Sequence, residues 1–182
     1  LEIMMQNRLL RGIRRLIQSE PDLQFCLQPD FIRGVRLLGK HGLSFDICIY
    51  HRQLRNAVEM AAQCDSVRIV LDHIGKPGIK DGLMDPWRQH IREMAALPHV
   101  HCKISGVITE ADHVNWKPEQ LRPYIEHVIS CFGFDRVMFG GDWHVLELAA
   151  RYPQWVEVMD AVLAGASKDE RRKFYRDNAL RF

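Results

Sequence analysis

Val67-Arg-Ile-Val-Leu-Asp-His73-Ile-Gly-Lys-Pro77 is a short, mostly apolar strand pattern that leads into an Asp-His pair and a Gly/Pro turn. Val137-Met-Phe-Gly-Gly-Asp142 repeats the arrangement later in the chain, with an apolar strand that ends on an acid. Polar side chains at the carboxyl ends of buried parallel strands carry the chemistry of α/β barrels. The two segments therefore indicate an enzyme rather than a binding module.

Strand-like and helix-like segments alternate on both sides of this stretch. We expect strands at 10–17, 45–50, 67–71, 100–106 and 136–139, and helices at 29–42, 53–63, 86–96, 118–131, 145–163 and 168–180. Successive β-α units form a parallel sheet, because right-handed crossovers pack each helix back onto it. The fold class is thus α/β, either an open doubly wound sheet or part of a (β/α)8 barrel.

Two observations bear on that choice. The chain has neither a Gly-x-Gly-x-x-Gly fingerprint nor a P-loop, which weakens the case for a nucleotide-binding open sheet. A complete (β/α)8 barrel needs roughly 250 residues, and this chain has 182. We treat residues 1–182 as one domain, and a barrel interpretation requires it to be partial.

Composition excludes several other classes of protein. A net charge of +2 provides no basic face for nucleic acid, and no apolar run approaches the length of a membrane span. The five cysteines are widely spaced without a Cys-x-x-Cys motif, so we expect reduced thiols in a cytoplasmic protein. The expected partner is a small-molecule substrate.

His73 and Asp142 are the candidate catalytic residues, since each is expected at the functional end of its strand. By alternation, His73 shares a face with Ile69 and Leu71, and Asp142 shares one with Met138. A carboxylate there can ligate a metal or accept a proton from water, and an imidazole can ligate a metal or bind a carbonyl. A satisfied core histidine and a helix N-cap are the alternative interpretations.

Four further residues are candidate substrate-binding groups. Lys103 lies inside a predicted buried strand, where it could hold an anionic substrate or neutralise Asp142, unless it extends outward to solvent. Arg14 lies in the first predicted strand, His51 follows the second, and Trp143 follows Asp142. Ser105 has no evident base and no Gly-x-Ser-x-Gly elbow, so a serine nucleophile is not expected.

Three ordered motifs resemble the amidohydrolase-2 branch of the amidohydrolase superfamily, and within it the sugar-lactone hydrolases. They are Leu71-Asp-His-Ile-Gly-Lys-Pro77, Lys103-Ile-Ser-Gly-Val-Ile-Thr-Glu-Ala-Asp112 and Met138-Phe-Gly-Gly-Asp-Trp143. The resemblance implies a (β/α)8 barrel of which this chain supplies strands four to eight. It makes His73 the strand-six histidine and Asp142 the strand-eight aspartate.

The resemblance also implies what this chain does not contain. Family members carry a His-x-His pair after strand one, whereas the only such pair here, His99-Val-His101, enters a later strand. The first three strands are then absent, and the chain is expected to pair with another copy or to belong to a longer protein. One divalent metal, zinc foremost, is the implied cofactor, with His73 and Asp142 as its ligands; metal-independent relatives leave both alternatives open.

The implied reaction is hydrolysis of an aldonolactone or related cyclic ester by water that Asp142 activates. One alternative is a metal-dependent decarboxylase of the same family that acts on aromatic acids. The alternative from another class is a non-catalytic truncated barrel that serves as an interaction module. The segment Ile108-Thr-Glu-Ala-Asp112 favours the lactonases.

Overall fold

Five parallel strands in sequential order form the centre of the molecule. A computed structural model describes the backbone of residues 1–182 and every side chain except that of Glu2. The strands are β1 (Gly12–Leu16), β2 (Ser44–Cys48), β3 (Ile69–Leu71), β4 (Val100–Ile104) and β5 (Val137–Phe139), in the order β1-β2-β3-β4-β5. Every neighbouring pair is parallel, as the predicted β-α units require.

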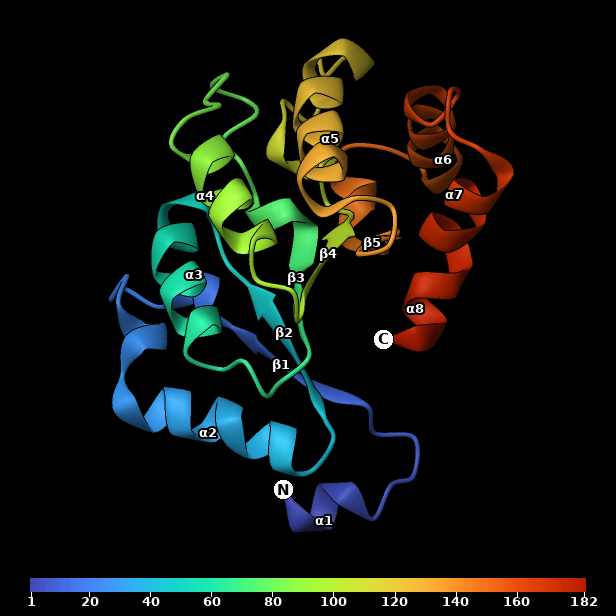
Figure 1. Cartoon of the computed structure of the whole chain (residues 1–182). Helices are drawn as coiled ribbons and strands as arrows, with labels where there is room; N and C mark the ends of the chain where they lie inside the picture. The colour runs from blue at the N-terminus through green and yellow to red at the C-terminus, as the bar shows by residue number, and fades with distance from the viewer.

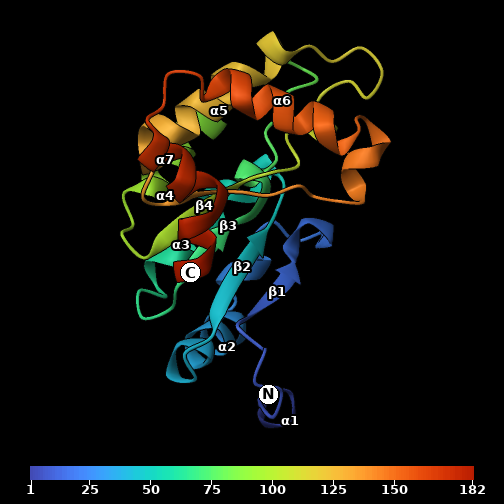
Figure 2. The same cartoon turned by 90° about the vertical axis from the view of Figure 1, so that its right-hand side faces the viewer.

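Helices follow each strand and lie mainly on one face of the sheet (Figure 1). The α-helices, of which α1 precedes the first strand, are α1 (Glu2–Met5), α2 (Pro29–Lys40), α3 (Leu54–Ala62), α4 (Trp87–Ala95), α5 (Pro118–Phe132), α6 (Tyr152–Val162), α7 (Lys168–Arg172) and α8 (Asn178–Arg181). In the side view of Figure 2, α1 extends away from the sheet at the N-terminal end of the chain. None of the described helices has the length and apolar character needed to cross a bilayer.

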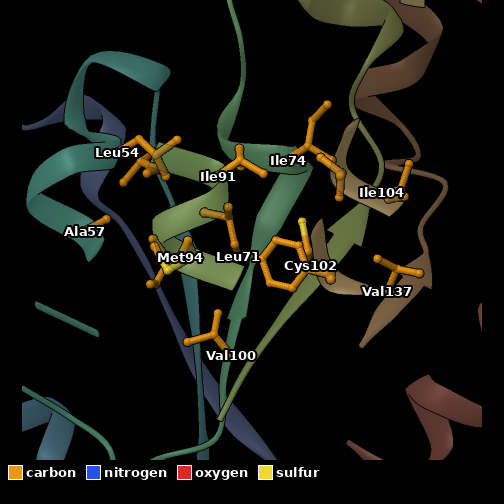
Figure 3. Close-up of a cluster of buried hydrophobic side chains, with 14 of the residues drawn as sticks. Leu54, Ala57, Leu71, Ile74, Ile91, Met94, Val100, Cys102, Ile104 and Val137 are labelled. Carbon is orange, nitrogen blue, oxygen red and sulfur yellow. The ribbon is translucent and has the colours of Figure 1, made fainter. Parts of the chain in front are cut away.

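The hydrophobic core lies between the sheet and α3 to α5. Alternate strand residues point into it, among them Leu71, Cys102 and Val137, and they belong to the same cluster as Leu54 of α3 and Ile91 of α4 (Figure 3). Each of these five side chains has no exposed surface. Burying such side chains is the main driving force for docking the helices.

The other face of the sheet is polar and lines a hollow of about 600 Å³. Its walls include Arg14, Asp46 and Lys103 from the strands and Leu180 and Phe182 from the C-terminal segment. Alternation along each strand produces this division, because residues at odd and even positions point to opposite faces.

Two predicted helices are wrong in extent. The segment predicted as one helix over 145–163 consists of a 3₁₀ turn at Val145–Leu148 and then α6, because Arg151 is extended and Pro153 lies in the first turn of the new helix. The segment predicted over 168–180 consists of α7, a π-helical stretch at Lys173–Asp177, and α8. The other predicted helices and all five strands are present, with ends that differ by a few residues.

Candidate active site

Asp72 lies at the centre of a charged network on the polar face of the sheet. Its side chain has no exposed surface, and its Oδ1 accepts a hydrogen bond from Lys103 Nζ at 2.7 Å. Arg14 Nε lies 2.8 Å from Asp72 Oδ2. Asp46 lies 3.4 Å from both the Arg14 and Lys103 cations. Two cations thus balance two carboxylates, which is how a buried charge is tolerated.

This network corrects one sequence-based interpretation of Lys103. The sequence allowed Lys103 to bind an anionic substrate, to neutralise Asp142 or to extend outward to solvent. Its ammonium contacts Asp72 and Asp46 rather than Asp142. Arg14 of β1, a predicted substrate-binding residue, contacts the same two carboxylates. Asp72 and Asp46 were missed, although alternation places Asp72 on the same face as Val70 and away from the helices.

His73 and Asp142 meet at the carboxyl end of the sheet, with His73 Nε2 lying 3.7 Å from Asp142 Oδ1. Each was expected to be the last residue of its strand, but neither belongs to a regular strand. Both follow the strand and have left-handed backbone conformations, with φ values of 54° and 50°. This conformation rotates His73 away from the face of Ile69 and Leu71, to which alternation alone assigns it. Residues other than glycine seldom adopt it, and it is frequent at functional sites.

The end of β4 forms the floor beneath this pair. Ser105 is 1% exposed, and its Oγ lies 2.8 Å from Nδ1 of His73. Gly106 has a φ of 58°, and a Cβ atom there would lie 2.8 Å from Asp142 Oδ2 and 2.9 Å from His73 Nδ1. Only glycine therefore fits between the two candidate catalytic side chains. Sequence analysis discounted Ser105 because it had no evident base, and the structure brings a histidine to it.

Burial controls the protonation of His73. Desolvation lowers the pKa of His73 to about 4, against the opposing effect of Asp142 and with further lowering by Lys76, Arg14 and Lys103. The imidazole is consequently neutral at neutral pH. Burial also raises the pKa of Glu110, which Lys76 opposes and Asp142 reinforces.

The other two predicted substrate-binding residues occupy the rim in different ways. His51 begins a 3₁₀ turn after β2, and its Nδ1 lies 3.0 Å from the carbonyl oxygen of Lys76. Trp143 is 70% exposed, and its indole donates a hydrogen bond to Glu147 at 3.1 Å. Lys76, which the sequence analysis did not single out, places its ammonium 4.0 Å from Glu110 Oε1 and 5.1 Å from the centre of the Tyr50 ring.

The donor atoms do not by themselves complete a zinc site. Cys48, Asp72 and His73 have ligand atoms within 4.8 Å of one another. However, Oδ1 of Asp72 accepts a hydrogen bond from Lys103, and Oδ2, which accepts no hydrogen bond, lies 2.8 Å from Arg14 Nε. Burial also raises the pKa of the Cys48 thiol, which would have to ionise to bind a metal. His73 and Asp142 supply two ligands, whereas a catalytic zinc takes three from the protein.

Comparison with known proteins places this arrangement in a family. The family model described as "Amidohydrolase" matches residues 1–182. The chain belongs to this amidohydrolase family. Its five strands correspond to part of the family's (β/α)8 barrel, in the C-terminal region, which confirms the fold class and the family that the sequence motifs indicated.

The curated relatives include two proteins named L-fucono-1,5-lactonase. The one from Burkholderia multivorans is 38% identical over 83% of this chain, and the one from Burkholderia ambifaria is 34% identical over 94% of it. The aligned parts make up 54% and 60% of those two proteins. This amidohydrolase chain thus spans little more than half the length of the curated lactonases it matches.

A solved structure shows the same similarity in three dimensions. An amidohydrolase from Burkholderia multivorans, crystallised with bound zinc, superposes with a TM-score of 0.92 at 33% sequence identity. The superposition covers 99% of this chain and 68% of that protein. A 2,6-dihydroxybenzoate decarboxylase superposes with a TM-score of 0.51 at 15% identity, which indicates a shared fold alone.

Proposed function

We propose that the protein containing this chain hydrolyses a sugar lactone or a related cyclic ester. The observation that carries the proposal is the meeting of His73 and Asp142 at the carboxyl end of the parallel sheet, 3.7 Å apart. The L-fucono-1,5-lactonases among the relatives support lactones as the substrate class. Activity, substrate and partners are proposed for the whole protein, since this chain spans only part of its relatives.

In the proposed reaction Asp142 is the general base. Its carboxylate takes a proton from a water molecule, and the water oxygen forms a bond to the lactone carbonyl carbon. The tetrahedral oxyanion then collapses as the bond from the carbonyl carbon to the ring oxygen breaks. The ring oxygen takes up the proton that Asp142 accepted and becomes a hydroxyl, and the product is an open-chain hydroxy acid. Neutral His73 lies beside the base, where it can bind the carbonyl oxygen.

A divalent metal is compatible with this function. If one is bound, it would polarise the lactone carbonyl and acidify water; His73 and Asp142 could supply two of its ligands, and the others would come from outside this chain. The decarboxylase alternative has only similarity of fold in its favour, at 15% identity. Lactone hydrolysis is therefore the function that the site supports best.

The test is Asp142→Asn in the natural-length protein, assayed on a panel of aldonolactones. We expect the hydrolysis rate to fall by about 10²–10⁴-fold, the usual contribution of a general base. Asp135→Asn is the matched control, because Asp135 precedes the opposite end of β5 and its side chain is 73% exposed. Full activity of Asp142→Asn would show that another group is the base. A wild-type protein inactive on every lactone would favour the interaction-module alternative.

A further inference from the structure

Ser105 is a buried polar group that the proposed reaction does not use. It follows β4 directly, is 1% exposed, and its hydroxyl oxygen lies 2.8 Å from Nδ1 of His73. Among the described side chains, this is the one hydrogen bond that its hydroxyl makes. A buried hydroxyl that lacks an acceptor for its proton is destabilising, so the direction of this bond matters.

The geometry excludes a nucleophilic role for Ser105. In a Ser-His-Asp triad the serine contacts Nε2 of the histidine and the carboxylate contacts Nδ1. Here the order is reversed, since Ser105 contacts Nδ1 and Asp142 lies on the Nε2 side. Ser105 is also nearly inaccessible, so its oxygen does not reach a substrate. Its contact with the site is through His73.

The direction of the hydrogen bond follows from its acceptors. If Nδ1 carried the imidazole hydrogen, Ser105 would accept that hydrogen, and its own hydroxyl proton would have no acceptor among the described residues. If Nδ1 is unprotonated, it accepts the Ser105 proton and both groups are satisfied. We propose that Ser105 is a positioning residue that donates to Nδ1 and holds His73 in the tautomer with its hydrogen on Nε2.

This tautomer defines what His73 offers to a ligand. The Nε2–H group lies on the side of Asp142, where it is a hydrogen-bond donor for the carbonyl oxygen of an ester and for the oxyanion formed from it. A metal ion on Nε2 requires the opposite tautomer, which leaves the Ser105 proton unpaired. The catalytic consequence rests on the proposed lactone hydrolysis, whereas the tautomer itself does not.

The experiment is ¹⁵N NMR of the natural-length protein labelled at histidine, at neutral pH and without substrate. The His73 ring signals are assigned by their loss in His73→Gln. We expect Nδ1 of His73 to show the chemical shift of an unprotonated nitrogen and Nε2 that of a protonated one. The opposite tautomer, or an even mixture of the two, would overturn the proposal. A negative lactonase panel would not affect this measurement.

Variants test whether Ser105 causes the preference. Ser105→Ala is expected to shift His73 toward a mixture of tautomers, and Ser105→Cys, with a weaker donor, toward an intermediate population. Ser44→Ala is the matched control, since Ser44 is a buried serine in the first position of β2 with its own bond to Arg11. If Ser105→Ala retained the wild-type population, the positioning role would be wrong. The wild-type spectrum remains decisive if Ser105→Ala does not fold.

Discussion

Asp72 and His73 are consecutive residues whose side chains lie in different surroundings. Asp72 points to the polar face of the sheet, where Lys103 and Arg14 neutralise it, and it has no exposed surface. His73 has a left-handed backbone and reaches the rim beside Ser105 and Asp142. The charge network below the rim therefore anchors the strand end that carries the candidate catalytic imidazole.

Replacing Asp72 should be costly, because its loss leaves two cations without their buried partner. We expect Asp72→Asn to lower the free energy of unfolding by about 3 kcal/mol, as is usual when one member of a buried ion pair is removed. Asp46→Asn should cost less than about 1 kcal/mol, since Asp46 is 22% exposed and 3.4 Å from its partners. Urea denaturation measures both values. Equal losses in the two variants would contradict the central position of Asp72.

Only part of the candidate active site could be predicted from the sequence. His73 and Asp142 were predicted to lie at one rim because each follows an apolar strand, and the structure brings them together. Alternation alone assigned His73 to the wrong face, since a left-handed turn after the strand cannot be inferred from apolar spacing. Ser105 was discounted and Asp72 was not singled out, because their contacts are with residues from other strands.

Periodicity predicted the position of each strand. It did not predict where the two C-terminal helical segments are interrupted. The five apolar segments became five parallel strands because neighbouring β-α units bury one another's apolar faces. The division between the Val145–Leu148 turn and α6 depends on the extended backbone at Arg151. The π-helical stretch at Lys173–Asp177 lies in a segment whose side-chain pattern is continuous, so it was predicted as uninterrupted helix.

The side chain of Asn178 links α8 to the sheet through hydrogen bonds. Its side-chain amide is almost fully buried and donates to the carbonyl oxygens of Phe134 and Val137, at 2.7 and 2.6 Å. We expect Asn178→Ala to lower the free energy of unfolding by about 2 kcal/mol, since two buried hydrogen bonds are lost. Leu180 in the same helix is 71% exposed, so Leu180→Ala should change the free energy of unfolding by less than about 0.5 kcal/mol. Hydrogen exchange should locate the loss of protection in α8; a change spread evenly over the chain would argue against a local role.

Acid should destabilise the whole fold through histidines that are partly or fully buried. Burial lowers the pKa of His101 to about 4, and nearby Arg136, Arg181 and Arg68 lower it further. Between its ordinary pKa of 6.5 and about 4, the unfolded chain binds a proton that the native state does not. Stability therefore falls as the pH falls through this range, and the lowered pKa of His73 acts in the same direction.

His101→Gln tests this linkage, because glutamine does not titrate. We expect the loss of stability between neutral pH and about pH 5 to be smaller in His101→Gln than in the wild type. Urea denaturation of both proteins at the two pH values measures the difference. His41→Gln, which changes an exposed histidine at the end of α2, is the control and should keep the wild-type pH dependence. If the free energy of unfolding of His101→Gln depended on pH as strongly as that of the wild type, the acid sensitivity would come from other groups.

The open sheet has a consequence for assembly. In the part of the chain that the structure describes, β1 and β5 are edge strands. Unpaired edge strands promote association with other chains. We therefore expect the 182-residue chain, expressed alone, to sediment as species larger than its 21.2 kDa monomer, with the fraction rising with concentration.

Leu16→Lys tests the edge directly, since Leu16 ends β1 and is 47% exposed. A charged side chain on an edge strand opposes edge-to-edge pairing, so this variant should sediment mainly as a monomer. Val114→Lys, at an 86% exposed loop position, adds the same charge away from the sheet and should associate like the wild type. Sedimentation velocity over a concentration series distinguishes them. A wild type that stays monomeric throughout would mean that the twist and charges of β1 already protect the edge. Equal association of both variants would show that the contact between chains does not involve β1.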